Sequence, residues 1–379
     1  MKKIVLVFGT RPEAIKMASL IRALKSEGNR FDVKVCVTGQ HREMLDQVLE
    51  VFDVIPDYDL GVMSSNSNSL GILAAILHGL ENVFKLERPN IVLVHGDTVS
   101  SLGGALSAFF HQIPYGHVEA GLRTYNLDAP FPEEFIRQVI SRGATWNFAP
   151  TDQSRVNLLQ EMVKPDSIYV TGNTVIDALK YTIHRVLDDS ARSFANMSHL
   201  SGILGFNPCE STFILVTCHR RENIGFGLKQ ICEALKVIAL KNPLVKMVFP
   251  VHLNPKVSTA VNASLRGIPN IRLVDPLSYE QFCFLLNYCY FVLTDSGGIQ
   301  EEAPSIGKPV LVMRDFTERT ESLAVGSIRL VGTEVNSIVR AAEELMLDEE
   351  AYGRMSRITT VYGDGFASEV ISRILYDHC

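Results

Sequence analysis

The amino-acid sequence predicts an α/β protein built from two doubly wound domains. Its 379 residues are too many for one ordinary hydrophobic core and about right for two. Short β-branched runs alternate with amphipathic helical stretches in the first half, and the same alternation begins again in the second half. Such alternation is typical of parallel sheets covered by helices on both faces. Because these sheets bind ligands at the carboxyl ends of their strands, we expect a site in a cleft between two facing domains.

The first alternating region defines the first domain. Its expected strands are residues 4–8, 33–38, 91–95, 115–118, 146–149 and 168–171. The clearest expected helices between them are the amphipathic stretches 12–26 and 99–111.

The second alternating region follows a break in the pattern. Its expected strands are residues 213–217, 245–251, 271–275, 291–294, 309–313 and 328–331, with a helix at 228–242. Residues 174–208 begin with a helical pattern and then become polar and irregular, DDSARSFANMSHLSG. We expect this stretch to be the linker between the domains.

Composition and charge exclude several classes of protein. Hydrophobic residues make up 46 % and charged residues 21 %, which is typical of a globular chain. A net charge of −6 and a pI of about 6.0 argue against nucleic acid as a main partner, since that requires a basic surface. The seven cysteines include no C-x-x-C pair, so we expect reduced thiols rather than disulfides or a zinc knuckle.

No targeting or membrane segment is expected. The start MKKIVLVFG resembles a signal peptide, but its apolar run of about six residues is shorter than an h-region. We find no apolar stretch long enough to span a bilayer. These observations predict a cytoplasmic protein without a membrane partner.

The end of the first expected strand carries cations at a helix start. Thr10, Pro12 and Glu13 have the form of a capping box with proline in the first turn, which is a structural explanation for all three. Arg11 and Lys16 lie where the helix dipole disfavours cations. A bound anion would compensate, and two solvated basic residues explain this stretch equally well.

Acidic residues follow the next strands. Asp97 and Glu119 come directly after expected strands, and Glu133 and Glu134 follow Pro132 at an expected helix start. Any one of these acids is explained by local structure, since carboxylates are favoured at helix starts. Together at one rim, clustered carboxylates can divide acid and base functions.

In the second half, cationic and titratable residues follow the strands. His219, Arg220 and Arg221 come after the strand at 213–217, and a histidine beside arginines suits a phosphate. His252 alone carries little weight, because a lone histidine is usually structural. Arg314 and Arg319 lie beyond the strand at 309–313.

The stretch TDSGGIQEE combines a glycine turn with two carboxylates. Bare amides at Ser296, Gly297 and Gly298 suit an anion, whereas Glu301 and Glu302 would repel one. A ligand with a phosphate and separate hydroxyl groups would satisfy both halves.

Several cofactor motifs are absent from the sequence. GFGLKQ at 225–230 lacks the third glycine and the preceding strand of a dinucleotide fingerprint. Neither a Walker A motif nor G-x-S-x-G occurs, and no metal-ligand spacing is apparent. We therefore expect no cofactor and no metal. The residues alone indicate a two-domain α/β enzyme that binds a phosphate-bearing small molecule.

Taken together, the motifs resemble one family. In chain order they are FGTRPEAIK, VTGQHREMLDQVL, VHGDT, GHVEAGLRT, PEE, TGNTVIDAL, HRREN, PVHLNP, TDSGGIQEEAP and GKPVLVMRD. This set is similar to the bacterial non-hydrolysing UDP-N-acetylglucosamine 2-epimerases. The match is in order and extends from about Lys3 to Gly365, so it is highly specific.

The resemblance implies a fold and a reaction. The fold is the glycosyltransferase-B type, two Rossmann-like domains with a final helix returning to the first. This gives domains at 1–173 plus 366–379 and at 174–365. The reaction interconverts UDP-N-acetylglucosamine and UDP-N-acetylmannosamine by eliminating UDP to a 2-acetamidoglucal and adding it back. The family further implies no cofactor, a homodimer, and a product used for surface polysaccharides such as capsule.

The resemblance also assigns roles to residues. The implied catalytic residues are Asp97, Glu119, Glu133, His219 and Lys16. The implied UDP contacts are Arg11, Phe282, Ser296, Gly297, Gly298, Glu302 and Arg319, with Phe282 at uracil and Glu302 at ribose. A second UDP-N-acetylglucosamine, acting as allosteric activator, would contact Gln40, His41, Arg220 and His252.

Two positions depart from the family pattern. The helix after Pro-Glu-Glu usually continues x-Asn-Arg, and Ile136 replaces the asparagine. Thr320 replaces proline in Glu-Arg-Pro-Glu, which would loosen the turn that aims Arg319. Neither departure removes a candidate catalytic residue.

Three alternatives remain beside the non-hydrolysing epimerase. A hydrolysing epimerase would release N-acetylmannosamine, but those relatives typically have Gly-Asp-Arg where this chain has Gly96-Asp97-Thr98. The others are a glycosyltransferase on the same fold and an inactive nucleotide-sugar sensor.

Overall fold

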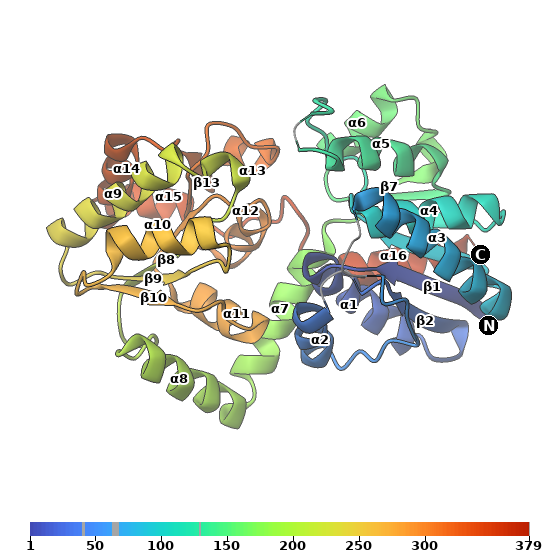
Figure 1. Ribbon diagram of the computed structural model, residues 1–379, viewed down its shortest axis with the longest axis horizontal. Helices are drawn as coiled ribbons and strands as arrows, with labels where there is room; N and C mark the ends of the chain where they lie inside the picture. The colour runs from blue at the N-terminus through green and yellow to red at the C-terminus, as the bar shows by residue number, and fades with distance from the viewer. Residues whose placement is uncertain (40–41, 63–67, 129, 379) are drawn as a thin grey trace. The chain divides into compact units, whose positions relative to one another are not determined.

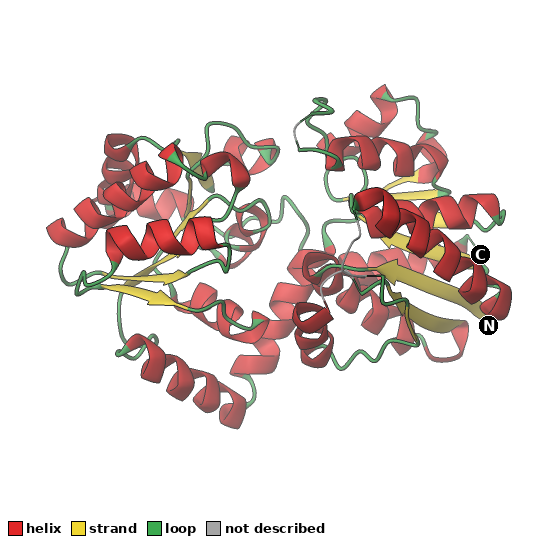
Figure 2. Ribbon diagram, in the orientation of Figure 1, coloured by secondary structure: helices red, strands yellow, loops and turns green. Residues whose placement is uncertain are grey.

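The chain folds into two parallel sheets, each with helices on both faces, in a computed structural model that describes residues 1–39, 42–62, 68–128 and 130–378 (Figures 1 and 2). Met1–Ala178 and Tyr362–Cys379 form one compact unit, and Leu179–Val361 form the other. The predicted class, two Rossmann-like doubly wound units, is confirmed.

The first unit is built on a seven-stranded sheet in the order β3-β2-β1-β4-β5-β6-β7, and all its pairs are parallel. Its strands are β1 (Lys2–Phe8), β2 (Phe31–Val37), β3 (Tyr58–Asp59), β4 (Ile91–His95), β5 (Tyr115–Val118), β6 (Trp146–Ala149) and β7 (Ile168–Val170). Its helices are α1 (Arg11–Ser26), α2 (Arg42–Val51), α3 (Ser69–Glu87), α4 (Val99–Phe110), α5 (Glu133–Gly143), α6 (Asp152–Gln160) and α16 (Ala367–Asp377). Short 3₁₀ turns lie at Gly28–Arg30 and Pro165–Ser167.

The second unit is built on a six-stranded parallel sheet in the order β10-β9-β8-β11-β12-β13. Its strands are β8 (Phe213–Thr217), β9 (Lys246–Pro250), β10 (Ile271–Val274), β11 (Val292–Thr294), β12 (Val310–Val312) and β13 (Ile328–Leu330). Its helices are α8 (Ser190–Leu204), α9 (Phe226–Lys241), α10 (Pro255–Leu265), α11 (Tyr279–Tyr288), α12 (Ile299–Glu302), α13 (Thr320–Ala324), α14 (Val335–Leu347) and α15 (Glu349–Met355). Helix α7 (Thr174–Leu187) begins in the first unit and ends in the second, and 3₁₀ turns lie at Arg221–Asn223 and Pro304–Ile306.

Strand order places a switch point in each sheet. β1 and β4 are neighbours in the first, and β8 and β11 are neighbours in the second. Connections leave these neighbouring strands toward opposite sides, which opens a crevice at their carboxyl ends. The motifs that follow β1, β4, β8 and β11 therefore lie where an open α/β sheet binds its ligand.

Apolar strands and helix faces form the core of each unit. In the first, Val5, Val92 and Val94 of the sheet pack with Ile76 and Leu80 of α3. In the second, residues of β8, β9 and β11 pack against α9, α10 and α14. Each such side chain contributes about 1.5–3 kcal/mol by leaving water. The central strands are buried on both faces, which explains their continuous apolar sequences.

The structure corrects the expectation of an irregular linker. Most of DDSARSFANMSHLSG belongs to helix α8. Asp189 caps the helix by accepting the backbone N–H of Ala191 at 3.0 Å, and Gly205 ends it in the left-handed conformation with φ 71°. Its buried side chains recur every fourth residue, at Asn196, Leu200 and Leu204. One of the three is polar, so the helical period was masked in the sequence.

The C-terminal helix α16 returns to the first unit, as predicted, and packs on α1 (Figure 1). Its amino end is capped from α7 rather than by its own residues. The Asp177 carboxylate accepts the N–H of Ser368 at 2.7 Å and of Ala367 at 3.3 Å. This contact fixes the last helix to the start of α7.

Two glycines allow close backbone contact beside α16. Gly172 has φ 84° and Gly363 has φ 104°. A Cβ at Gly172 would lie 2.9 Å from the Cα of Gly363 and 3.2 Å from the carbonyl oxygen of Tyr362. The neighbouring N–H of Asn173 donates to that same carbonyl at 2.7 Å. Only glycine fits at this crossing.

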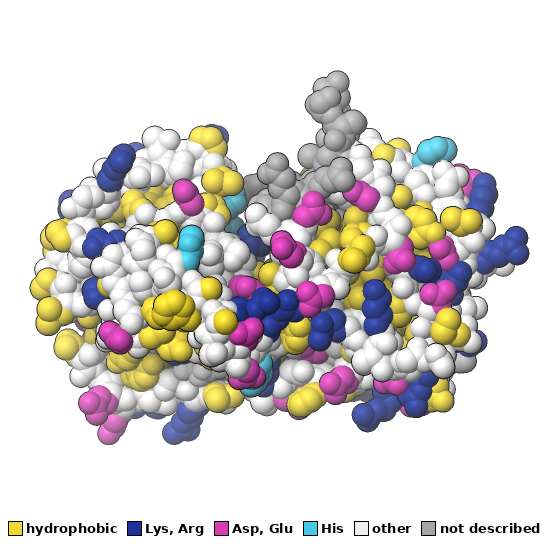
Figure 3. All heavy atoms as spheres, turned by 90° about the horizontal axis from the view of Figure 1, so that it is seen from below, with side chains coloured by type: hydrophobic (Ala, Val, Ile, Leu, Met, Phe, Trp, Pro, Cys, Tyr) yellow, Lys and Arg dark blue, Asp and Glu magenta, His cyan; other side chains and the backbone are white. Residues whose placement is uncertain are grey.

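One helix among the described residues, α3, is long and apolar enough to cross a membrane by length and composition. This contradicts the expectation from the sequence that no apolar stretch is long enough to span a bilayer. α3 buries Ile72, Ile76 and Leu80 in the first unit, but only 28 % of its most apolar stretch is buried. On the face in Figure 3, cationic and anionic side chains are interspersed.

Candidate active site

Glu13 is a buried carboxylate that joins two helix starts in the first unit. It accepts the N–H groups of Gly9 and Thr10 at 3.1 and 2.8 Å, which completes the predicted capping box. It also accepts the hydroxyls of Thr98 and Ser101 at 2.6 and 2.9 Å. Burial raises the pKa of Glu13, and these hydrogen bonds oppose that shift. Glu13 thus fixes the loops after β1 and β4 beside each other.

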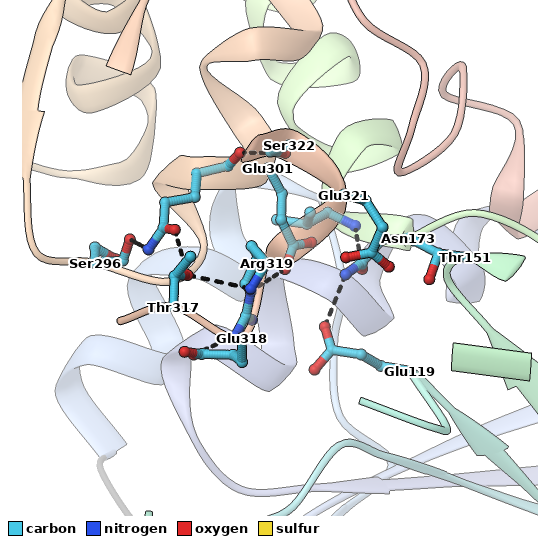
Figure 4. A network of polar contacts seen from close by, with 12 residues as sticks. Glu119, Thr151, Asn173, Ser296, Glu301, Thr317, Glu318, Arg319, Glu321 and Ser322 are labelled. Atoms are coloured by element: carbon cyan, nitrogen blue, oxygen red, sulfur yellow. Dashed lines mark hydrogen bonds and ion pairs between the residues drawn. The ribbon is translucent and has the colours of Figure 1, made fainter. Parts of the chain in front are cut away.

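Glu119, which follows β5, is the centre of the carboxylate cluster. Its Oε2 pairs with Lys16 Nζ and accepts from Asn173 Nδ2 at 2.8 Å, as Figure 4 shows for Asn173. Its Oε1 accepts from Arg137 Nη2 at 3.1 Å. The side chain is almost fully buried, so two cations stabilise its ionised form. Its backbone is left-handed, φ 65°, which is costly for a non-glycine residue.

Asp97 shares a guanidinium with Glu119. Arg137 Nη2 lies 2.6 Å from Asp97 Oδ2 as well as 3.1 Å from Glu119 Oε1. The structure therefore brings together the two carboxylates that the sequence placed on one rim. Asp97 is the more accessible, with 25 % of its side chain exposed against 3 % for Glu119.

The two acids at the start of α5 have different surroundings. Glu134 accepts the N–H groups of Thr124 and Tyr125 at 2.9 and 3.1 Å, which is a structural role. Glu133 Oε2 is buried and has no hydrogen-bond partner among the described residues. Because Glu133 precedes Arg137 by four residues, both project from the same face of α5. Glu133 is therefore a carboxylate with unused acceptor capacity beside the Asp97–Glu119 pair.

Two buried histidines near these carboxylates are in the neutral form. Burial lowers the pKa of both His95 and His117 to about 3. His117 is held between the Gly96 carbonyl at 2.8 Å and the Ser141 hydroxyl at 3.0 Å. His95 Nε2 lies 3.8 Å from Glu119 Oε2, too far for a hydrogen bond.

In the second unit, the buried carboxylate of Asp295 holds the loop after β8. It accepts the N–H groups of His219 and Arg220 at 3.0 and 2.9 Å, and Asn223 Nδ2 at 3.0 Å. The Cys218 thiol also donates to it at 3.2 Å. Asp295 thereby joins the two motifs TDSGG and HRREN.

The glycine turn lies against two arginines. A Cβ at Gly297 would lie 3.0 Å from Arg220 Nη2 and 3.2 Å from Arg319 Cζ. A side chain at this position would displace both guanidinium groups. Ser296 N donates to the Thr294 hydroxyl at 2.9 Å. Arg220 and Arg319 therefore lie beside the predicted phosphate turn.

The two carboxylates of TDSGGIQEE have separate partners. Glu301 is buried and accepts Arg319 Nε at 2.8 Å. Glu302 lies 3.4 Å from the hydroxyl of Tyr279, on α11. Phe282, three residues after Tyr279, is partly exposed on the same helix face. Glu301 is therefore the structural counter-ion of Arg319. Glu302 instead faces α11, the helix that carries Phe282.

Glu318 connects an ionic chain around the glycine turn. It pairs with Arg319 and, at 3.1 Å, with Arg314, which in turn pairs with Glu222 at 2.7 Å. Figure 4 shows Arg319 between Glu301 and Glu318. Burial alone would raise the pKa of Glu318, but Arg319 and Arg314 outweigh it and lower the pKa to about 2. Arg319 is thus aimed by two ion pairs although Thr320 replaces the family's proline.

We expect a Glu318→Gln variant to be less stable than wild type near neutral pH, and this difference to disappear in acid. The folded pKa of about 2 lies below the ordinary 4.5, so the ionised form stabilises the fold above about pH 4.5, and this contribution disappears as the pH falls toward 2. Breaking such a buried pair costs about 3–5 kcal/mol near neutral pH. Urea denaturation followed by circular dichroism should show a difference from wild type that narrows steadily below pH 4.5. A constant difference would contradict this assignment.

The remaining predicted residues are placed as follows. Arg11 is the first residue of α1, and Ile136 is buried in the core of the first unit. His252 stacks on His219, with ring centroids 5.8 Å apart and planes at 15°. Gln40 and His41 lie outside the described residues.

Sequence reasoning missed three residues that organise these sites. Arg137 bridges Asp97 and Glu119, Asn173 orients Glu119, and Asp295 holds His219 and Arg220. Spacing offered one signal, because Arg137 follows Glu133 by one helical turn. The other two roles depend on contacts between distant segments.

Comparison with known proteins gives consistent results. The family model described as UDP-N-acetylglucosamine 2-epimerase matches residues 22–376. A protein of that name from Yersinia pestis is 52 % identical over 376 residues, covering 99 % of each chain, and one from Campylobacter jejuni is 50 % identical over 374 residues, covering 99 % of this chain and 97 % of its own. The crystal structure of a UDP-GlcNAc 2-epimerase from Neisseria meningitidis bound to UDP-GlcNAc superimposes with a TM-score of 0.93 at 44 % identity, covering 100 % of both chains.

Proposed function

Because the chain belongs to the UDP-N-acetylglucosamine 2-epimerase family, we propose that it interconverts UDP-N-acetylglucosamine and UDP-N-acetylmannosamine without net hydrolysis. The observation that carries this proposal is the cluster at the carboxyl edge of the first sheet. One guanidinium there joins two carboxylates, and a lysine pairs with the inner one. This cluster combines acid and base groups with cations for a departing anion, which elimination requires.

The elimination step needs a base for the proton at C2. As the base takes this proton, the C2–H electron pair forms the C1=C2 bond, and UDP departs with the electrons of the C1–O bond. Re-addition returns a proton to the other face of C2 and re-forms the C1–O bond. The two epimers present the C2 proton on opposite faces, so two proton-transfer groups are needed.

The carboxylates divide these roles according to their surroundings. Glu119 has both oxygens engaged, by Lys16, Asn173 and Arg137, so we assign it the positioning of these groups. Asp97 pairs with Arg137 through Oδ2, and Glu133 has a buried oxygen without a partner among the described residues. Asp97 and Glu133 are therefore the candidates for the two proton transfers.

The UDP group is assigned to the second unit. The amides of Gly297 and Gly298 and the flanking Arg220 and Arg319 suit a diphosphate. The Ser296 amide already donates to Thr294, so Ser296 would contribute its hydroxyl. Glu302 would accept the ribose hydroxyls, and Phe282 would lie on uracil. The resemblance also assigns Arg11 to UDP and gives Lys16 a catalytic role.

Incubation with UDP-N-acetylglucosamine in deuterated water tests the reaction class. Without an acceptor, proton NMR should show an equilibrium mixture of two UDP-sugars with deuterium at C2. Support for the non-hydrolysing class comes from Thr98, where hydrolysing relatives typically have arginine. Free N-acetylmannosamine accumulating with UDP in equal amounts would overturn the proposal, and an unchanged spectrum would indicate a transferase or a sensor.

The wider biological setting stays a prediction from the resemblance. It includes a homodimer, a cytoplasmic location, a product used for surface polysaccharide, and activation by a second UDP-N-acetylglucosamine. For the second molecule, the stacking of His252 on His219 gives support, since a ligand at His252 would contact a catalytic candidate.

A further inference from the structure

The His219 ring lies between a buried carboxylate and a second histidine. Its Nδ1 faces Asp295 Oδ1 at 3.6 Å, and its face stacks on His252. About 40 % of the side chain is exposed to solvent. Burial of the remainder lowers the pKa of His219, with Arg220 and His252 acting in the same direction and Asp295 opposing them. The ring is therefore neutral at neutral pH, and the position of its single proton matters.

The two oxygens of Asp295 are unequally occupied. Oδ2 accepts four donors: the N–H of Arg220, the amide of Asn223, the thiol of Cys218 and the N–H of His219, which it shares with Oδ1. Oδ1 accepts the N–H of His219 and otherwise faces the ring nitrogen Nδ1. At 3.6 Å the ring and the carboxylate do not form a hydrogen bond, but the negative charge of Oδ1 favours a proton on the nitrogen that faces it, so a neutral ring in this position keeps its proton on Nδ1.

We propose that Asp295 is a positioning residue that fixes the tautomer of His219, so that Nε2 is the nitrogen that exchanges protons with the nucleotide sugar. This inference rests on the proposed function for its consequence. In its protonated form the ring donates the Nε2 proton to the departing diphosphate, which leaves the Nδ1 tautomer, and Nε2 takes that proton back from the diphosphate when UDP is added again. His252 keeps the opposite tautomer, because its Nδ1 accepts the N–H of Asn254 at 3.1 Å.

An Asp295→Asn substitution should reverse the tautomer. The amide oxygen of the new side chain would take the Oδ2 position, where four donors converge. The amide NH₂ would then face Nδ1 and donate to it, which moves the ring proton to Nε2. We expect kcat for deuterium exchange at C2 to fall roughly 10²-fold or more, the usual effect of losing a correctly protonated acid–base group.

The test uses the full-length protein labelled with ¹⁵N in histidine. Long-range ¹H–¹⁵N correlation spectra, with a His219→Gln variant for assignment, should show wild-type His219 protonated on Nδ1 alone. Asn223→Ala is the matched control, because it removes another donor to Asp295 and loosens the loop without altering Oδ1. It should retain the tautomer and most of kcat.

Each outcome decides the question. Wild-type His219 protonated on Nε2 would overturn the inference even if Asp295→Asn fails to fold. The inference would also be wrong if Asp295→Asn kept both tautomer and kcat, or if Asn223→Ala shifted the tautomer equally, since the role of Asp295 would then be purely structural. A Nδ1 tautomer in a protein that does not turn over UDP-N-acetylglucosamine would refute the proposed function while leaving the tautomer assignment intact.

Discussion

A Glu119→Gln variant is expected to lose C2 deuterium exchange by about 10²–10⁴-fold while still binding UDP. Glutamine has the shape of glutamate but cannot neutralise Lys16 and Arg137, which both pair with Glu119. Arg137 would keep its pair with Asp97, whereas Lys16 would lose the charge of Glu119. The proposed UDP contacts of Ser296–Gly298 belong to the other unit, so UDP affinity measured by calorimetry should change little.

Glu134→Gln is the matched control for this variant. Glu134 is also a buried carboxylate of the first unit, but its partners are the Thr124 and Tyr125 N–H groups and the Gln138 amide. The Glu134→Gln variant should have lower thermal stability than wild type, and its rate of C2 exchange should stay within a few-fold of the wild-type rate. Full exchange activity in Glu119→Gln would remove Glu119 from the mechanism.

A Gly172→Ala variant is expected to destabilise the first unit by about 2–5 kcal/mol. Alanine is disfavoured at φ 84°, by about 1–2 kcal/mol, and its Cβ would lie 2.9 Å from Gly363 Cα. Forcing these backbones apart adds an overpacking cost of about 1–3 kcal/mol. The shift would also pull Asn173 away from Glu119, so C2 exchange should fall as well.

The single tryptophan allows the free energy of unfolding of the first unit to be measured by itself. Trp146 is buried in β6 of the first unit, so its fluorescence during urea denaturation reports that unit. Gly202→Ala is the control, because Gly202 is exposed in α8 of the second unit and a Cβ there meets nothing within 4 Å. That control should raise helix stability by up to about 1 kcal/mol and leave the Trp146 transition unchanged. Equal transitions for Gly172→Ala and wild type would refute the close-contact argument.

Much of the fold could be predicted because buried parallel strands have a simple sequence pattern. β4, β5, β6 and β8 begin and end at the predicted residues. Among them, β4 is the clearest case, an apolar run that is followed by glycine. β3, with two residues, is too short to show a pattern. Helix α8 was missed because its buried face includes Asn196 and its composition favours turns.

The candidate site could be predicted only where a functional residue stands directly after a strand. Asp97, Glu119, His219 and Ser296 follow strands, so the parallel topology brings them to a sheet edge. Asn173 could not be predicted as a ligand of Glu119, because 54 residues separate the two and their contact depends on the course of the chain past β7. Hydrogen-bond partners of buried carboxylates are set by packing rather than by local sequence.

The return of α16 has a consequence for the order in which the protein matures during synthesis. The second unit is one continuous segment, Leu179–Val361, whereas the first unit needs its final helix from the last residues of the chain. On the ribosome, the second unit can therefore complete its core while the α16-binding surface of the first is still exposed. The Asp177 cap and the Gly172–Gly363 crossing form only after residues 363–368 have been synthesised. Until then, the surface of α1 that α16 covers stays exposed.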